Sequence, residues 1–223
     1  MANGKSFLID TTKCFACRSC QVACKQWNEL PAEDPVPVNR GTYENPPDLS
    51  YTQRLKIQFR ESERSDGTLA WTFVRSSCRH CINAPCKQAA ADPDAILVDP
   101  VSGAVLFQEA TRDESYRDIR LKCPFDIPRQ GPDGQLYKCV MCVDRLDNES
   151  LPEGDRIPAC AKACPSDAIK FGDRDAILAM AYARLEAVQA DGFPNAKLLD
   201  PRDVRLIILL ADEADKYALS TRG

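Results

Sequence analysis

Closely and regularly spaced cysteines are the first feature of this sequence that could do chemistry. There are 12 cysteines in 223 residues, and the first four read Cys14-x2-Cys17-x2-Cys20-x3-Cys24. In this spacing, three thiolates bind one cubane [4Fe-4S] cluster and the fourth thiolate binds a neighbouring cluster. The other eight cysteines form Cys78-x2-Cys81-x4-Cys86, Cys123-Pro124 and Cys139-x2-Cys142-x17-Cys160-x3-Cys164-Pro165. A pattern of this kind predicts an electron carrier.

The cysteines divide into three complete ligand sets if the fourth cysteines of the first and last groups are exchanged. No cysteine is then left over, so the sequence predicts three [4Fe-4S] clusters. We name the sets quartets I, II and III. They are Cys14, Cys17, Cys20 and Cys164 for quartet I, Cys24, Cys139, Cys142 and Cys160 for quartet II, and Cys78, Cys81, Cys86 and Cys123 for quartet III.

Two other uses of cysteine compete with this interpretation. Zinc also binds Cys-x2-Cys pairs, but tetrahedral zinc sites draw on two separated pairs and not on one run of four. Disulfides require an oxidising compartment and are usually found in smaller scaffolds. A zinc-stabilised interaction module without a redox role is therefore the alternative hypothesis, and the metal content would discriminate the two.

The remaining composition argues against several classes of function. Neither G-x-G-x-x-G nor G-x-x-x-x-G-K-[ST] occurs, so we predict no dinucleotide or phosphate-loop site and assign no catalytic residue. The formal net charge of -4, without a basic block, argues against nucleic-acid binding. Residues 1–10 lack the pattern of a secretory leader, and the longest apolar run, 206–211, is far shorter than the roughly 20 residues of a membrane span. We therefore expect no direct membrane span.

Short strands and two helices are predicted between the cysteine groups. Expected strands are 7–10, 54–59, 70–75, 96–98, 105–107 and 168–171, with turns at Ser65-Asp66-Gly67 and 99–103. One helix is expected over 20–28, with Val22, Ala23 and Trp27 buried. Another is expected from an N-cap at Asp173 to about Ala190, ended by Gly192. An irregular stretch is marked by Pro31, Pro35, Pro37, Pro46 and Pro47.

These elements predict an α+β fold of two ferredoxin-like modules, the second inserted in the first, with β-hairpin insertions and a C-terminal helical and extended tail. The first module comprises residues 1–30 and 135–172 and holds two clusters. The second comprises 76–130 and holds one cluster. Residues 31–75 form an insertion with a β-hairpin, and 173–223 form a helix and a docking tail. We expect the tail and the proline-rich stretch to wrap the outside, and metal binding to contribute much of the folding free energy.

With these cysteine groups, residues 5–172 resemble the four-cluster iron–sulfur (beta) subunits that partner molybdenum and tungsten bis-pterin oxidoreductases. In that family, each of four groups gives three ligands to one cluster and lends a fourth to another. Here one cluster's positions carry Ala90, Asp113, Tyr116 and Ile119 in place of cysteine. The resemblance implies that this cluster is absent and that the other three remain. We expect Tyr116 and Ile119 to fill the vacated volume.

Local segments are similar to the formate dehydrogenase branch of this family. They are Cys20-Gln-Val-Ala-Cys24-Lys-Gln-Trp-Asn28, Cys123-Pro-Phe-Asp-Ile-Pro-Arg129 and Tyr137-Lys-Cys-Val-Met-Cys-Val-Asp-Arg145. Without a following membrane helix, the chain most resembles the small subunit of the soluble periplasmic formate dehydrogenases of sulfate-reducing bacteria. The resemblance implies an electron-transfer subunit without a catalytic site of its own.

The same resemblance implies the partners. A large catalytic subunit, with a W or Mo bis-pterin cofactor and its own Fe–S cluster, would oxidise formate to CO2. Electrons would pass through quartets I, II and III to a soluble multihaem cytochrome c. The chain would be exported to the periplasm with the catalytic subunit, and a cytoplasmic location is the alternative. The alternative function is the same electron-transfer role with a polysulfide, nitrate or sulfoxide reductase.

A few other residues beside the cysteines have two interpretations each. His80, the only histidine, lies between two ligands, and we expect it to pack or hydrogen-bond because every cluster already has four cysteines. Lys122 and Lys138 each precede a ligand, where a positive charge raises a cluster's reduction potential, although such lysines are often only solvated. Trp27 and Tyr116 are expected to pack in the core and not to relay electrons.

Overall fold

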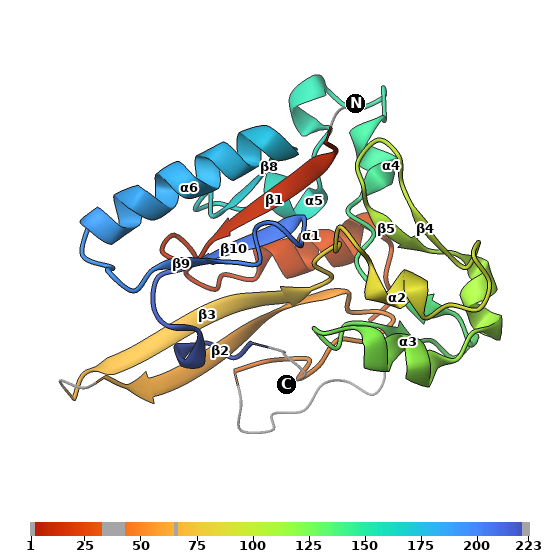
Figure 1. Ribbon diagram of the computed structural model, residues 1–223, viewed down its shortest axis with the longest axis horizontal. Coiled ribbons are helices and arrows are strands. Elements are labelled where there is room, and N and C mark those ends of the chain that lie inside the picture. Colours follow the sequence, from red (N-terminus) through yellow and green to blue (C-terminus); the bar gives the residue numbers. More distant parts are fainter. Residues whose placement is uncertain (1–2, 33–42, 65–66, 220–223) are drawn as a thin grey trace.

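The computed structural model describes residues 3–32, 43–64 and 67–219. Its largest sheet has the strand order β8-β1-β10-β9 and is flanked by the long helix α6 (Figure 1). β1 (Lys5–Asp10) pairs antiparallel with β8 (Ile169–Asp173) and parallel with β10 (Leu206–Leu210). β9 (Lys197–Leu199) pairs antiparallel with β10. The sheet therefore joins segments from both ends of the chain around β1.

β10 separates two cores. Leu206, Ile208 and Leu210 lie in the core that also contains Cys20, Cys24 and Cys160, whereas Ile207 and Leu209 lie in the core under α6. All five residues of β10 are fully buried. The expectation that the C-terminal tail wraps the outside is wrong for this strand, because a continuous apolar run is stable only when both faces are covered.

α6 (Arg174–Ala190) begins and ends where the sequence predicts, and only the side-chain cap at its N-terminus is missing. Its buried apolar positions are Ile177, Ala181 and Val188. Asp173 occupies the N-cap position, but its side chain makes no capping hydrogen bond. The carboxylate instead pairs with Lys5 Nζ at 2.7 Å, across the β1–β8 pair. Gly192 follows the helix with a φ of 91°, the left-handed conformation that suits glycine.

In the described part of the chain, three hairpins lie outside this sheet. The predicted strands appear as the antiparallel pairs β2 (Leu55–Glu63) with β3 (Leu69–Ser77) and β4 (Ile96–Val98) with β5 (Val105–Phe107). The sequence does not predict the short pair β6 (Arg129–Gln130) and β7 (Leu136–Tyr137). Ser65 and Asp66 of the predicted turn, and Pro35 and Pro37, lie outside the described residues.

The other helices are short and lie close to cysteines. They are α1 (Ser19–Trp27), α2 (Pro85–Gln88), α3 (Tyr116–Lys122), α4 (Val143–Leu146) and α5 (Ala159–Lys162), with 3-10 turns at Glu109–Asp113, Glu153–Asp155 and Ala214–Lys216. α1 packs against α5, which brings the first and last cysteine groups together. The fold is thus a mixture of small sheets and short helices that is compatible with the expected α+β class.

The buried face of α1 differs from the expected one. Val22 is 64% exposed, and Ala23 and Trp27 are only partly buried. The face turned inward carries Cys20, Gln21 and Cys24. Gln21 is buried because its side-chain oxygen accepts a hydrogen bond from the Ile57 backbone N–H at 2.7 Å, which ties α1 to β2. The helix therefore presents its cysteines to the interior and leaves an apolar side chain outside.

Within residues 3–32, 43–64 and 67–219, no helix combines the length and apolarity needed to span a bilayer.

Candidate iron–sulfur sites

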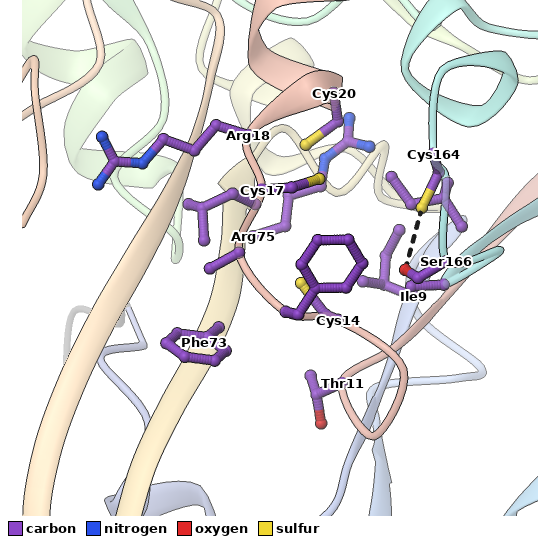
Figure 2. A pocket seen from close by; sticks show the side chains of 15 residues that line it. Ile9, Thr11, Cys14, Cys17, Arg18, Cys20, Phe73, Arg75, Cys164 and Ser166 are labelled. Carbon is purple, nitrogen blue, oxygen red and sulfur yellow. Dashed lines mark hydrogen bonds between the residues drawn. The ribbon is translucent and has the colours of Figure 1, made fainter.

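Quartet I surrounds a cavity between the loop after β1 and the end of β3 (Figure 2). Figure 2 labels its four cysteines and Ile9 around the cavity. The apolar side chains of Phe15 and Ile57 also line it. Burial raises the pKa of Cys20 to about 12; Arg75 opposes this shift, and Cys160, Cys14 and Cys164 add to it. Thiolates are therefore unfavourable here unless a cationic metal centre compensates their charge.

Quartet II lies in the interior. The exposed fractions of its four cysteines range from 4% for Cys160 to 8% for Cys24. Burial raises the pKa of the Cys24 thiol well above its ordinary value, and Cys139, Cys160 and Cys142 add to the shift. Burial also raises the pKa of Cys142 to about 12. The structure thus brings the four members of quartet II together, away from solvent.

Quartet III lines a second cavity, together with Lys138, Phe125 and the prolines beside its ligands. Burial raises the pKa of Cys81 to about 12, and Cys123 and Cys86 add to the shift. The four cysteines surround a space and do not meet at one point. In the described part of the chain, no three His, Cys, Asp or Glu side chains are placed to bind a single metal ion.

Quartet II lies between the other two quartets. Cys20 of quartet I neighbours Cys160 of quartet II, and Cys78 of quartet III neighbours Cys139 of quartet II. The outer quartets approach the surface through Cys14, Cys17 and Cys164 in quartet I and Cys81 and Cys86 in quartet III. The molecule therefore has a buried central site with one partly exposed site on either side.

One backbone feature recurs in all three quartets. The sulfur of the first cysteine in a Cys-x2-Cys pair interacts with the backbone N–H two residues later. The pairs are Cys14 with Ala16, Cys78 with His80 at 3.4 Å, and Cys139 with Met141 at 3.4 Å. The three later residues have positive φ angles of 57°, 48° and 60°, which cost a non-glycine residue roughly 1–2 kcal/mol each. N–H donors that point at a sulfur stabilise its negative charge.

The residue types alone do not predict these backbone N–H donors. Ala16, His80 and Met141 share no side-chain chemistry, since the backbone alone makes the contact. Their only signal is their position two residues after a cysteine.

Two buried cations test whether these sites fit an anionic group. Arg75, on β3, is 4% exposed and donates from Nη1 to Cys160 Sγ at 3.3 Å. Lys138 is also 4% exposed; its Nζ donates to the carbonyl oxygens of Val105 and, at 3.1 Å, Cys139. No Asp or Glu of the described residues forms an ion pair with either cation. Buried charges require a counter-charge, and four thiolates around a [4Fe-4S] core carry net negative charge, so the residues fit the cluster.

The other residues considered from sequence take these positions. His80 is fully buried and its Nδ1 accepts a hydrogen bond from Val105 N–H at 3.1 Å, in agreement with the expected packing role. Lys122 is exposed, in contrast to Lys138. Trp27 donates from Nε1 to Asp144 Oδ2 at 2.6 Å, so it contacts α4. Sequence reasoning did not identify Arg75; the available signal was its inward position on an alternating strand next to a cysteine group.

Three of the four positions that carry cysteine in the resembling family lie in one apolar cluster. Ile119 is fully buried there, and Ala90 and Tyr116 pack against the same cluster together with Cys86. Arg120 Nη1 donates to the Tyr116 hydroxyl at 3.0 Å. Asp113 is exposed at the end of its 3-10 turn. Tyr116 and Ile119 thus belong to the packed core beside quartet III.

Comparisons with known proteins agree with this chemistry. Residues 69–174 match the 4Fe-4S dicluster domain family. The formate dehydrogenase subunit beta of Megalodesulfovibrio gigas is 44% identical over 217 residues, which cover 96% of each chain. The protein "formate dehydrogenase 2 subunit beta (cytochrome c-553)" of Nitratidesulfovibrio vulgaris is 41% identical over 219 residues, again 96% of each chain. The formate dehydrogenase-O iron-sulfur subunit of Escherichia coli is 38% identical over 88% of this chain and 62% of its own.

The site and these likenesses first define an iron–sulfur protein, of which residues 69–174 match a 4Fe-4S dicluster domain. The chain belongs to the family of formate dehydrogenase beta subunits, which confirms the resemblance noted in the sequence. Members of this family are the electron-transfer subunits of an oxidoreductase complex and not its catalytic subunits.

Proposed function

We propose that each quartet holds one [4Fe-4S] cluster and that the chain conducts electrons from a formate dehydrogenase catalytic subunit to a soluble acceptor. The arrangement of the quartets carries this proposal. Quartet II is buried, while quartets I and III each have cysteines at the surface. A conductor between two partners needs an entry site, an exit site and an insulated centre. The neighbouring pairs Cys20–Cys160 and Cys78–Cys139 support the order I, II, III.

The bound clusters would store one electron reversibly, and the chain's own residues would set the reduction potential of each cluster. The backbone N–H groups of His80 and Met141 stabilise charge on sulfur. Burial of quartet II disfavours the added negative charge of a reduced cluster, whereas the buried cations Arg75 and Lys138 favour that charge.

We also propose the finer architecture. Residues 1–30 and 135–172 form one ferredoxin-like module with two clusters, and 76–130 form a second, inserted module with the remaining cluster. The packing of α1 on α5 and the pairing of β1 with β8 support the first module. The apolar cluster around Ile119 supports the absence of a fourth cluster from the second module. Residues 31–75 are then an insertion and 173–223 a C-terminal extension that takes part in docking.

We propose the partners that the family resemblance implies. A catalytic subunit with a W or Mo bis-pterin cofactor and its own Fe–S cluster would oxidise formate to CO2. The name of the N. vulgaris relative includes cytochrome c-553, which supports a cytochrome c as the acceptor. We propose that this acceptor is a soluble multihaem cytochrome c. We propose a heterodimer that is exported to the periplasm with the catalytic subunit.

The replacement Cys123→Ser tests the order of the quartets. In the purified heterodimer, iron content should fall by about a third, because one of three proposed clusters is lost. Formate-dependent reduction of an artificial dye that accepts electrons upstream should persist, and cytochrome reduction should be lost. The matched variant Cys20→Ser, in quartet I, should lose both reactions.

Two results would contradict the proposal. If dye and cytochrome reduction fall equally in Cys123→Ser, the proposed order is wrong. If the purified chain contains zinc and lacks iron and sulfide, it does not carry clusters at all.

A further inference from the structure

We infer that Arg75 is a positioning residue that sets the reduction potential of the quartet II cluster relative to that of quartet I. This inference rests on the proposed ligand sets. It extends them by assigning a role to a residue outside the cysteine loops, since Arg75 lies on β3 of the long hairpin.

The guanidinium of Arg75 is held on three sides. Nη1 donates to Cys160 Sγ at 3.3 Å, and Nε donates to Ser77 Oγ at 2.8 Å. The guanidinium carbon also lies over the Phe7 ring, 5.4 Å from its centroid. Figure 2 shows the side chain reaching toward Cys20 at the edge of the quartet I cavity. Arg75 therefore occupies the boundary between quartets I and II with little freedom to move.

The charge of Arg75 has no carboxylate to neutralise it among the described residues. Cysteines of both quartets are its electrostatic partners, namely Cys160 and Cys139 of quartet II and Cys20 of quartet I. Arginine remains protonated at every working pH, so this charge is permanent. A buried cation without an anion is unstable, and the two clusters are the anions that the geometry provides.

A permanent cation between two clusters acts on them unequally. Adding an electron makes a cluster more negative, so a nearby positive charge stabilises the reduced form and raises the potential. The hydrogen bond to Cys160 Sγ makes this effect larger for quartet II. Within the described part of the chain, Arg75 donates no hydrogen bond to a cysteine of quartet I, which is affected by the charge alone. The structure therefore favours an electron on quartet II over one on quartet I.

Arg174 is a suitable control because it is equally buried, at 4% exposure. Its guanidinium bonds the Ser6 hydroxyl and carbonyl oxygens of the 201–204 segment, and none of these bonds reaches a cysteine. Replacing it removes the same buried group without removing a charge from the boundary between the quartets.

The experiment is an EPR-monitored redox titration of the purified heterodimer, with iron and sulfide content measured on each sample. Arg75→Gln removes the charge and keeps a hydrogen-bond donor. It should lower the potential of the quartet II cluster relative to that of quartet I, so that the one-electron equilibrium between them changes tenfold or more, which corresponds to 59 mV. Arg75→Lys keeps the charge and should produce a smaller shift. Arg174→Gln should leave the potentials unchanged.

A second route keeps the test decisive if Arg75→Gln binds no iron. Ser77→Asp places a carboxylate where Oγ now accepts from Arg75 Nε, so it neutralises the charge without shortening the arginine. It should shift the potential in the same direction.

Unchanged potentials in an iron-loaded Arg75→Gln or Ser77→Asp protein would overturn the inference and leave the proposed function standing. Equal shifts in Arg75→Gln and Arg75→Lys would also overturn it, because lost packing would then explain the change. A wild-type heterodimer whose beta subunit lacks iron would instead refute the proposed function.

Discussion

Two adjacent isoleucines on β10 allow a matched test of how the core retains the clusters. Ile207 and Ile208 are both fully buried on the same central strand. Ile208 lies in the core with Cys20, Cys24 and Cys160, whereas Ile207 lies in the core under α6. Replacing either residue with alanine removes the same atoms from an equally buried position. Only the Ile208→Ala variant opens space on the side of the cysteines.

The expected cost in stability is the same for both variants. A buried isoleucine truncated to alanine loses about 2–5 kcal/mol of unfolding free energy, through lost transfer free energy and the cavity that remains. For a chain of 223 residues, each kcal/mol lowers the thermal midpoint by about 2–4 °C. The two variants should therefore have similar midpoints, both below that of the wild type.

The retention of the clusters should separate the variants. The assay is the anaerobic decay of visible absorbance in the folded protein with an iron chelator present, beside urea unfolding followed by circular dichroism. Ile208→Ala should bleach several-fold faster than Ile207→Ala, because the wall behind quartets I and II is loosened. Equal bleaching rates at equal stability would show that this face of the sheet does not support the clusters, and would refute the reasoning.

Two further predictions concern single contacts. Tyr217 is buried, and its hydroxyl accepts a hydrogen bond from Ala211 N–H at 3.0 Å and lies 3.1 Å from Thr11 Oγ1. Tyr217→Phe should therefore lower the unfolding free energy, measured by urea unfolding, by about 1–3 kcal/mol. An unchanged urea midpoint would contradict this prediction. Lys138→Gln should lower a cluster's reduction potential in a redox titration without loss of iron, because it removes a buried charge beside quartet III. The control Lys122→Gln should leave the potentials unchanged, because Lys122 is exposed. Identical titrations for the two variants would mean that burial of the lysine is irrelevant.

The local part of this protein could be predicted from sequence. Ligand loops depend on short spacings, so the cysteines grouped into candidate quartets before any fold was considered. The strands Ile96–Val98 and Val105–Phe107 and the long helix Arg174–Ala190 were also predicted closely, because their hydrophobic periodicity is a local signal. The same local logic misplaced Val22, since it assumed that an apolar residue turns inward when cysteines in fact occupy that face.

The tertiary structure decided how those parts combine. From sequence, β10 was expected to belong to a C-terminal tail. It is instead a central strand, because it pairs with β1, nearly 200 residues earlier in the chain. In sequence, Arg75 is one position of an alternating strand. In the structure, it donates a hydrogen bond to Cys160, 85 residues later in the chain. The sequence alone therefore predicted which side chains would bind iron, because ligand spacing acts within a single loop. Only the fold determined which quartet is buried and which cation lies between two quartets, because these depend on contacts between distant segments.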